Sequence, residues 1–441
     1  MKLISTYSVK LKEYRHIFKD TIRVYRAAVD FFLMVCDQEW EKVSDISTSK
    51  FQMTFIEQLT HKTAKNPATK YDFDAVFYKF PSYLRRAAIY ETLGKYFSYR
   101  SNLANWERDP QGRKPSFPKA GYVYPCLYRD GMYERTDIYT ARIKVYIRNT
   151  WDWIDIKLRK SDVDYIQRHC SHRKECAPTL QKRGKEWFLD FPFEEQVTLN
   201  NTPSKEQVIA AVDLGINSAA TVSVMRADGT VLGRHFCRFP REKDSLTHAV
   251  NRIKKAQQHG ARKMPRLWAR ANGINDDIAV KTAKFIIDVA VLYNADVIVF
   301  EHLDLKGRKR GSKKQRLHLW KARRVQSIVT DQAHRLGMRV SHVNAWNTSR
   351  LAFDGSGRVL RGRQSEKTGG SYSVCEFQNG KVYNCDLNAT YNIGARYFIR
   401  TLLKSLPATE RLVVEAKVPS CAKRSTCTLS TLTSLYAVLA A

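Results

Sequence analysis

Three acidic residues stand at positions from which carboxylates could meet at one site. Asp213 ends the apolar run VIAAV and is followed by Leu-Gly-Ile-Asn, and Glu301 ends DVIVF in the same way. Asp386 lies in CDLNATYNIG, where helical spacing puts Asp386, Ala389 and Ile393 on one face. Carboxylate oxygens are the ligands that hard cations such as Mg²⁺ prefer. Two such ions, about 3.5–4 Å apart, activate water on one side of a phosphodiester and stabilise the leaving oxygen on the other.

Each acid also has a plainer interpretation. An Asp after a strand commonly forms a turn, for which Gly215 would supply the bend, and Asp386 could be an ordinary helix N-cap. Carboxylates also gather in ion-pair networks. Glu301 is harder to explain in these ways, because an unpaired carboxylate after buried residues is costly. Two strand-end acids and one helix-borne acid are together what an RNase H-like fold needs. We therefore predict Asp213, Glu301 and Asp386 as catalytic ligands of two Mg²⁺ ions, with Mn²⁺ as a substitute.

A run of positive residues begins shortly after Glu301. A charge run is commonly a solvated face, but beside a site for phosphate chemistry it favours contact with a nucleic-acid backbone. The predicted nucleic-acid-binding residues are Lys306, Arg308, Lys309, Arg310, Lys313, Lys314, Arg316, Lys321, Arg323 and Arg324.

The composition indicates a polyanionic partner. The 441 residues include 75 Lys and Arg against 43 Asp and Glu, a net charge of +32. Such an excess repels itself in a compact fold, so nucleic acid is the first candidate, an anionic membrane surface the second and a plain basic protein the third. The longest apolar stretch, 285–300, is broken by polar residues and predicts a helix followed by a strand. The start lacks a secretory apolar region, and nine irregularly spaced cysteines indicate reduced thiols. We expect a protein of the bacterial cytosol or nucleoid, without a membrane partner.

The elements that must position the acids follow from hydrophobic periodicity. Residues 3–11 alternate as one strand, 14–105 have helical spacing, and the segment after the Gly/Pro-rich linker 109–121 alternates as antiparallel strands. After a second linker, three strands, a long helical stretch at 245–293 and the strand ADVIVFEHL predict an α/β domain.

Three motifs also resemble a known family. DLGIN (213–217), FEHL (300–303) and CDLNATYNIG (385–394) are similar to the three RuvC motifs of the TnpB family. These are transposon-encoded RNA-guided nucleases related to compact type V CRISPR effectors. The resemblance extends through 323–350 and upstream to GRKPSFPKAG, is weakest over the first hundred residues and is absent from the last 35 or so. It implies that Asp213, Glu301 and Asp386 are the metal-binding catalytic acids. It also implies a bound guide RNA that pairs with double-stranded target DNA beside a short flanking motif.

The same resemblance implies the domain organisation. We expect an α/β RNase H-like (RuvC) nuclease domain with an N-terminal helical recognition lobe and an OB-like β-barrel wedge domain. The expected boundaries are a first wedge strand at 1–13, the recognition domain at 14–105, the wedge barrel at 106–200, the nuclease domain at 201–405 with a degenerate zinc-ribbon insertion at 349–385, and a Ser/Thr-rich tail at 406–441.

The sequence departs from the family at the zinc ribbon. Typical members carry two CxxC pairs between the second and third motifs, because structural zinc takes four N or S ligands. Here RLAFDGSG has no cysteine at the first pair, and the second keeps Cys375 and, further on, Cys385. We expect no zinc site. A second cluster, HCSHRKEC (169–176), matches no zinc template and is expected to be a basic surface loop.

Two other functions remain open at this point. A cleavage-deficient RNA-guided DNA-binding regulator would be expected to lose one acid, and all three are present. A DDE-type transposase would work without guide RNA and would not need the long N-terminal half. The sequence does not distinguish a transposon-encoded protein from a CRISPR effector, and it leaves the oligomeric state open.

Overall fold

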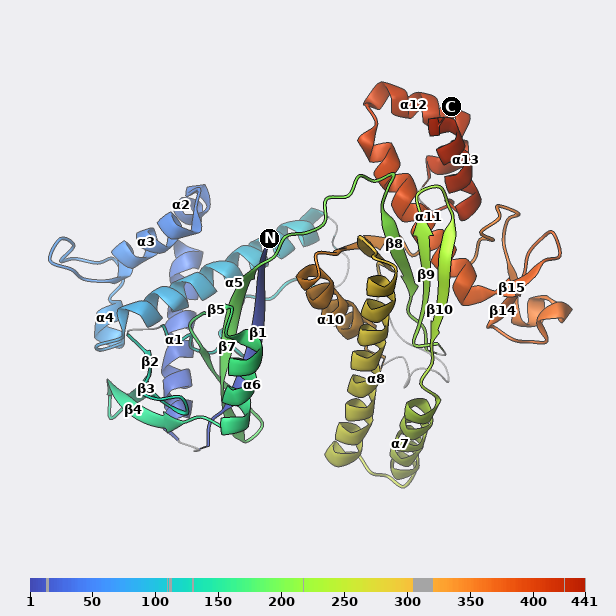
Figure 1. Cartoon of the computed structure of the whole chain (residues 1–441). Coiled ribbons are helices and arrows are strands. Elements are labelled where there is room, and N and C mark those ends of the chain that lie inside the picture. The colour runs from blue at the N-terminus through green and yellow to red at the C-terminus, as the bar shows by residue number, and fades with distance from the viewer. Residues whose placement is uncertain are drawn as a thin grey trace. The chain divides into compact units, whose positions relative to one another are not determined.

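The computed structural model describes residues 1–12, 16–108, 110, 113–128, 131–216, 218–303, 320–423 and 425–440. The chain divides into two compact units (Figure 1). We call Lys2–Glu195 the N-terminal unit and Gln196–Ala441, which Met1 joins, the C-terminal unit. Within the described residues, no helix is both long and apolar enough to cross a bilayer.

The N-terminal unit combines helices with two antiparallel sheets. Its helices are α1 (Ile17–Gln38), α2 (Trp40–Asp45), α3 (Ser49–Thr60), α4 (Phe73–Val76), α5 (Ser82–Arg108) and α6 (Lys160–Cys170). Its strands are β1 (Lys2–Lys10), β2 (Tyr133–Arg135), β3 (Thr140–Ile147), β4 (Thr150–Lys157), β5 (Lys174–Glu175), β6 (Thr179–Arg183) and β7 (Glu186–Gln196). One sheet has the order β1-β7-β5 with β6 also on β7, and the other the order β2-β3-β4. The strand predicted at 3–11 is confirmed as β1.

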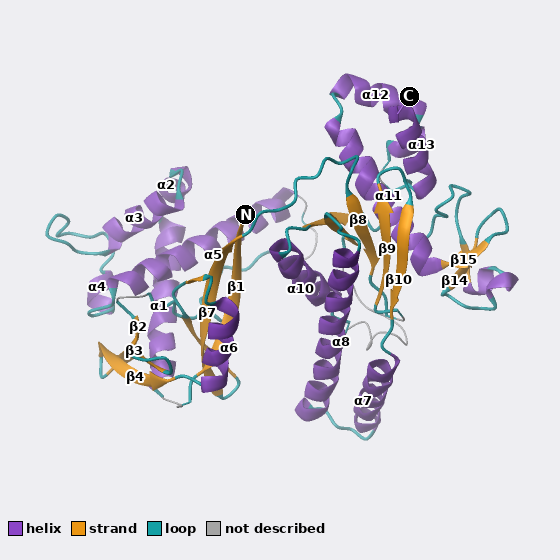
Figure 2. Ribbon diagram, viewed as in Figure 1, coloured by secondary structure: helices purple, strands orange, loops and turns teal. Residues whose placement is uncertain are grey.

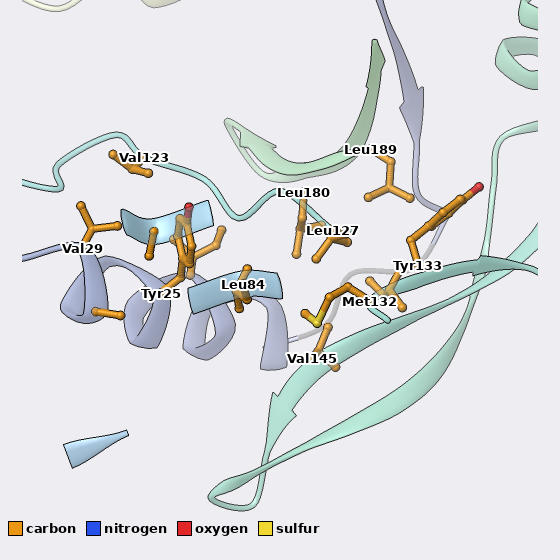
Figure 3. Close-up of a cluster of buried hydrophobic side chains, with 14 of the residues drawn as sticks. Tyr25, Val29, Leu84, Val123, Leu127, Met132, Tyr133, Val145, Leu180 and Leu189 are labelled. Atoms are coloured by element: carbon orange, nitrogen blue, oxygen red, sulfur yellow. The ribbon is translucent and has the colours of Figure 1, made fainter. Parts of the chain in front are cut away.

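One hydrophobic core joins the helices and sheets of this unit. Tyr25 of α1 and Leu84 of α5 belong to the same buried cluster as Val145 of β3 and Leu189 of β7 (Figure 3). Helix α1 buries residues three or four positions apart, which gives it the apolar stripe of an amphipathic helix. The helical and β-rich stretches on either side of the 109–121 linker therefore fold around a shared core.

The C-terminal unit is built on a five-stranded mixed sheet. Its strands are β8 (Val208–Asp213), β9 (Ala220–Arg226), β10 (Val231–Cys237), β11 (Val297–Glu301) and β12 (Arg339–Val343), in the order β10-β9-β8-β11-β12. Strand β8 pairs antiparallel with β9 and parallel with β11, and β11 pairs parallel with β12. Its helices are α7 (Pro240–Gln258), α8 (Pro265–Leu292), α10 (Ala322–Arg335), α11 (Cys385–Ser405), α12 (Ala408–Lys417) and α13 (Leu429–Ala440). The predicted α/β organisation is confirmed.

The prediction of one continuous helical stretch at 245–293 is wrong, because the segment forms two separate helices. Helix α7 ends at Gln258, and Gly260 follows with a φ of 81°, a conformation that glycine adopts without steric cost. Helix α8 begins at Pro265, where proline needs no helical hydrogen bond.

Helices cover both faces of the sheet (Figure 2). Alternate residues of β8 and β11 point into two different hydrophobic cores, one on each face of the sheet. The core on the side of α11 contains Ile209, Ala211, Val297 and Val299. Ala210, Val212, Ile298 and Phe300 share the other with α8 and α10. Helix α11 lies very close to the sheet at Gly394, where an added Cβ would come within 2.6 Å of Met225 Sδ.

Two further parts complete this unit. Residues 360–384 carry the small sheet β13 (Leu360–Arg361), β14 (Val374–Glu376) and β15 (Val382–Asn384), together with the 3₁₀ turns η1 (Gly362–Gln364) and η2 (Glu366–Thr368). The segment expected as a Ser/Thr-rich tail forms α12, the 3₁₀ turn η3 (Pro419–Cys421) and α13. Leu432 and Leu435 of α13 are fully buried in the core that contains α11.

Candidate active site at the carboxyl ends of β8 and β11

Strand register brings two of the predicted acids together. Val212 of β8 pairs with Phe300 of β11, so the next residues along these parallel strands are Asp213 and Glu301. Side chains alternate between the faces of a strand. Asp213 follows Ala211 by two positions and Glu301 follows Val299 by two, so both carboxylates lie on the face that α11 covers. Gly215 turns the chain directly after Asp213, since an added Cβ would lie 2.8 Å from the Ser218 carbonyl oxygen.

The third acid is carried by the first turn of α11. Asn384 is the N-cap of this helix, and its side-chain oxygen accepts hydrogen bonds from the backbone N–H groups of Asp386 and Leu387, both at 3.0 Å. The interpretation of Asp386 as the helix N-cap is therefore wrong. The Asp386 carboxylate is half-buried and is not used to cap the helix.

Two of the acids act electrostatically on the third, Asp213. Burial, followed by the negative charges of Glu301 and Asp386, raises the pKa of Asp213 well above its ordinary value, and Arg361 opposes this. Burial also raises the pKa of Glu301, against the hydrogen bond from Thr348 and the charge of Arg396. Carboxylates that disfavour one another's charge are stabilised by a cation between them. The donor set thus fits a divalent metal ion that prefers oxygen ligands.

The described residues contain no closed metal-binding cluster of three His, Cys, Asp or Glu side chains. The charges of Glu301 and Asp386 nevertheless both act on Asp213, so the three acids lie near one another.

Glu301 is oriented by residues that the sequence analysis did not single out. The Thr348 hydroxyl donates a hydrogen bond to the Glu301 carboxylate. Gln326 of α10 donates to the Glu301 backbone carbonyl at 3.1 Å. Thr348 is buried, and it belongs to the loop after β12 rather than to a motif that contains an acid.

Helix α11 contacts that loop and the preceding strand β12 through four polar side chains at intervals of four residues. Asn388 donates to the Leu351 carbonyl at 2.8 Å and accepts from the Phe353 N–H at 2.8 Å. Asn392 donates to the carbonyls of Thr348 and Leu351, both at 2.9 Å. Arg396 and Arg400 continue the same face of α11, and we call the four side chains the α11 ladder.

The two arginines of the ladder reach further along the chain. Buried Arg396 donates to the carbonyls of Asn344 and Trp346 at 2.7 Å, and to those of Ser425 and Cys427 at 3.1 and 3.2 Å. Arg400 donates to the His342 carbonyl and the Ser341 hydroxyl at 2.8 and 2.6 Å. The spacing of 388, 392, 396 and 400 is visible in the sequence and could have revealed the ladder, because these positions share one helix face.

Arg361 also adjoins the site without having been predicted. Its charge acts on Asp213 and on the thiols of Cys375 and Cys385. Among the described residues, its Nε and Nη2 atoms are buried without a hydrogen-bond partner. Cys375 of β14 and Cys385, the first residue of α11, share one buried cluster, and the neighbouring Cys385 thiol lowers the pKa of Cys375.

Most of the predicted basic stretch falls outside the described residues, namely Lys306, Arg308, Lys309, Arg310, Lys313, Lys314 and Arg316. Of the remainder, Lys321 and Arg324 both form ion pairs with Asp276, at 2.5 and 3.0 Å. Arg323 is exposed. Of the three predicted basic residues that the structure describes, Lys321 and Arg324 are therefore paired within the protein.

The second candidate cluster, 169–176, belongs to the N-terminal unit. Arg173 forms an ion pair with Glu195 at 3.0 Å and donates to the Tyr7 hydroxyl at 3.2 Å, while Cys170 is buried. These side chains serve packing and ion pairing.

Comparisons with known proteins bear on the family. The model of the Aq_aa04 family matches residues 5–147. The TnpB-like protein aq_aa05 of Aquifex aeolicus (strain VF5) is 27% identical over 238 residues, which are 48% of this chain and 74% of that protein. The chain is similar to a TnpB-like protein. The resemblance that the three motifs indicate is thus confirmed.

Solved structures similar to this chain include two guide-RNA complexes. Cas12f1 with single-guide RNA and target DNA overlaps at a TM-score of 0.34 with 12% identity, over 89% of this chain and 98% of that one. C2c1 of Alicyclobacillus acidoterrestris with single-guide RNA overlaps at a TM-score of 0.42 with 11% identity, over 86% of this chain and 66% of that one.

Proposed function

We propose that this protein is an RNA-guided DNA endonuclease that hydrolyses phosphodiesters at Asp213, Glu301 and Asp386. The observation that carries the proposal is the convergence of these acids from two adjacent parallel strands and the first turn of α11. Three carboxylates would bind Mg²⁺, with Mn²⁺ as a substitute. When bound, two such ions would activate water and stabilise the leaving oxygen.

The protein's own residues supply the positioning. Register fixes Asp213 beside Glu301, Thr348 orients the Glu301 carboxylate, and the α11 ladder ties the Thr348 loop to the helix that carries Asp386. Groups fixed in this way lose little freedom when a substrate binds. The net charge of +32 supports a nucleic-acid substrate, because each phosphate contact releases counterions.

The proposal that the protein binds a guide RNA and a double-stranded DNA target rests on its similarity to a TnpB-like protein. In this scheme base pairing selects the target, while the protein recognises a short flanking motif and the duplex shape. We assign residues 201–405 as the RNase H-like (RuvC) nuclease domain. We further assign 14–105 as the helical recognition domain, and 1–13 with 106–200 as the OB-like wedge.

The test is cleavage by the complete chain, purified together with its coexpressed RNA. Asp213→Ala, Glu301→Ala and Asp386→Ala should each abolish Mg²⁺-dependent cutting of a guide-matched duplex while binding persists. Asp228→Ala, which removes an exposed turn carboxylate that accepts from Thr230, is the matched control and should cut normally. Near-normal cutting by Asp213→Ala would exclude the assignment.

Two further readouts separate the alternatives. Sequencing the copurified RNA should give one defined small species, whereas a DDE-type transposase would yield none. A cleavage-deficient regulator would bind the matched duplex and leave it intact in the wild type. Metal analysis should find much less than one zinc per chain, because the cysteine pairs of the ribbon are incomplete.

A further inference from the structure

One tryptophan differs from all the others in this chain. The eight tryptophans all lie within the described residues, and seven of them are buried or half-buried. Trp346 is 68% exposed. An exposed ring of this size gives up the favourable free energy that burial would provide. We therefore ask whether the exposed ring binds a ligand.

The backbone that presents Trp346 is fixed rather than loose. Its N–H donates to the Asn344 side chain at 2.7 Å, and its carbonyl accepts from the buried Arg396 guanidinium at 2.7 Å. Asn347 follows with a φ of 64°, in the left-handed region that asparagine tolerates better than most residues. The exposed ring therefore stands on a preorganised turn, which lowers the entropy cost of using it to bind.

The position of that turn identifies what the ring would meet. Trp346 precedes Thr348, the residue that hydrogen-bonds the Glu301 carboxylate, by two positions, a span of at most about 7 Å. Arg350, four residues further on, is exposed and positive. An exposed aromatic ring and an exposed cation beside a phosphodiester site are the two components with which proteins hold single strands.

We propose that Trp346 is a stacking platform for a base of the single-stranded DNA that enters the carboxylate site. Resting on the proposed function, this assigns the substrate as an unpaired strand, since a base can lie on the ring only when it has left its duplex stack. Arg350 would contact the neighbouring phosphate. Stacking accepts any base, so the platform would position the strand without selecting its sequence.

The experiment is a double-mutant cycle between the ring and the base. Trp346→Ala, Trp346→Phe and wild type are assayed as complete guide-loaded protein on DNA in which one abasic nucleotide is moved along the cut strand. Tyr372→Ala is the matched control, because Tyr372 is also 68% exposed and lies in the same unit. Binding constants are measured in parallel in the Asp213→Ala background, so that this measurement does not depend on DNA cleavage.

Trp346→Ala should lower cleavage of intact DNA by about 5- to 150-fold, the range for one stacked base, while Trp346→Phe retains most activity. One abasic position near the cut should cost the wild type the same factor and cost Trp346→Ala almost nothing more. Tyr372→Ala should behave as wild type.

Wild-type rates in Trp346→Ala, or independent losses at every abasic position, would overturn the platform while leaving the nuclease assignment intact. If the wild type fails to cut at all, the proposed function fails, and coupling between Trp346 and one base in the binding constants still decides the platform. Thermal midpoints check folding. Should Trp346→Ala unfold early, the Phe variant and the abasic scan of the wild type carry the test.

Discussion

At the scale of single residues, the negative charges of Glu301 and Asp386 disfavour ionisation of Asp213. Asp213 carries a raised pKa because it is buried beside two other carboxylates. A folded-state pKa above the unfolded value means that the folded chain holds its proton more tightly. Stability should therefore fall as the pH rises past the ordinary value of about 3.9 for Asp. Ionisation of Asp213 is therefore expected to lower the stability of the fold.

This predicts a pH-dependent gain from neutralising Asp213. Without metal, Asp213→Asn should raise the thermal midpoint by about 2–4 °C at pH 8 and by progressively less toward pH 4. Added Mg²⁺ should stabilise the wild type and have little effect on the variant. Differential scanning calorimetry with and without EDTA checks this. An equal shift at every pH would mean that the charge of Asp213 is not the cause.

A second prediction concerns the hydroxyl that orients Glu301. Thr348→Val keeps the shape of the side chain and removes the hydrogen bond, so cleavage should fall by about 10-fold or more while the fold persists. Thr348→Ser keeps the hydroxyl and should restore most of the rate. Equal rates for Val and Ser would show that Glu301 needs no such partner.

At the scale of elements, helix α11 joins the site to its supports. The ladder puts Asn388 and Asn392, both fully buried, against the backbone of the loop that contains Thr348. Removing Asn392 takes the donor from the Thr348 carbonyl, and removing Asn388 takes the acceptor from the Phe353 N–H. Either loss costs about 1–3 kcal/mol. The position of Glu301 and the position of Asp386 thus depend on the same helix.

Asn392→Ala should accordingly lower both stability and activity. We expect a fall in the thermal midpoint of about 2–4 °C for each kcal/mol lost, together with slower cleavage below the melting range. Asn379→Ala is the control, since Asn379 is exposed and its side chain only donates to Asp354 and accepts from the Lys381 N–H. A stability loss with an unchanged cleavage rate would confine the ladder to a structural role.

The sequence predicts the elements and the acids better than it predicts their supports. Asp213 and Glu301 follow runs of buried β-branched and small residues, so periodicity alone places them at strand ends. Thr348 lies in a loop and Arg361 in the two-residue strand β13, both too short or irregular for a period to be read, and the ladder resembles an ordinary polar helix face. The Ser/Thr-rich composition of 406–441 hides α13, whose buried Thr431 lies against buried Thr428 just before the helix.

At the scale of the whole molecule, the charge of +32 is partly committed inside the protein. Lys321 and Arg324 pair with Asp276, so the unpaired cations needed for phosphates must come from elsewhere. We expect replacing Lys309, Arg310, Lys313 and Lys314 together to weaken nucleic-acid binding. Each lost phosphate contact should flatten the log–log salt dependence by about 0.7–0.9. Lys321→Ala with Arg324→Ala should change that slope less. Equal slopes for wild type and the fourfold variant would leave the run as a solvated face.

The contacts of Arg396 limit how many residues could be removed from the C-terminal end of this chain. Its guanidinium is buried between the Trp346 turn and the carbonyls of Ser425 and Cys427. A chain cut after residue 405 would lose two of those acceptors and open the cavity that Leu432 and Leu435 fill. We expect such a version to express poorly or lose cutting, and a chain trimmed from 425 onward to suffer in the same way, because it lacks the same acceptors and the same buried leucines. Assaying the two truncations with and without Arg396→Met measures whether the last helices can be spared.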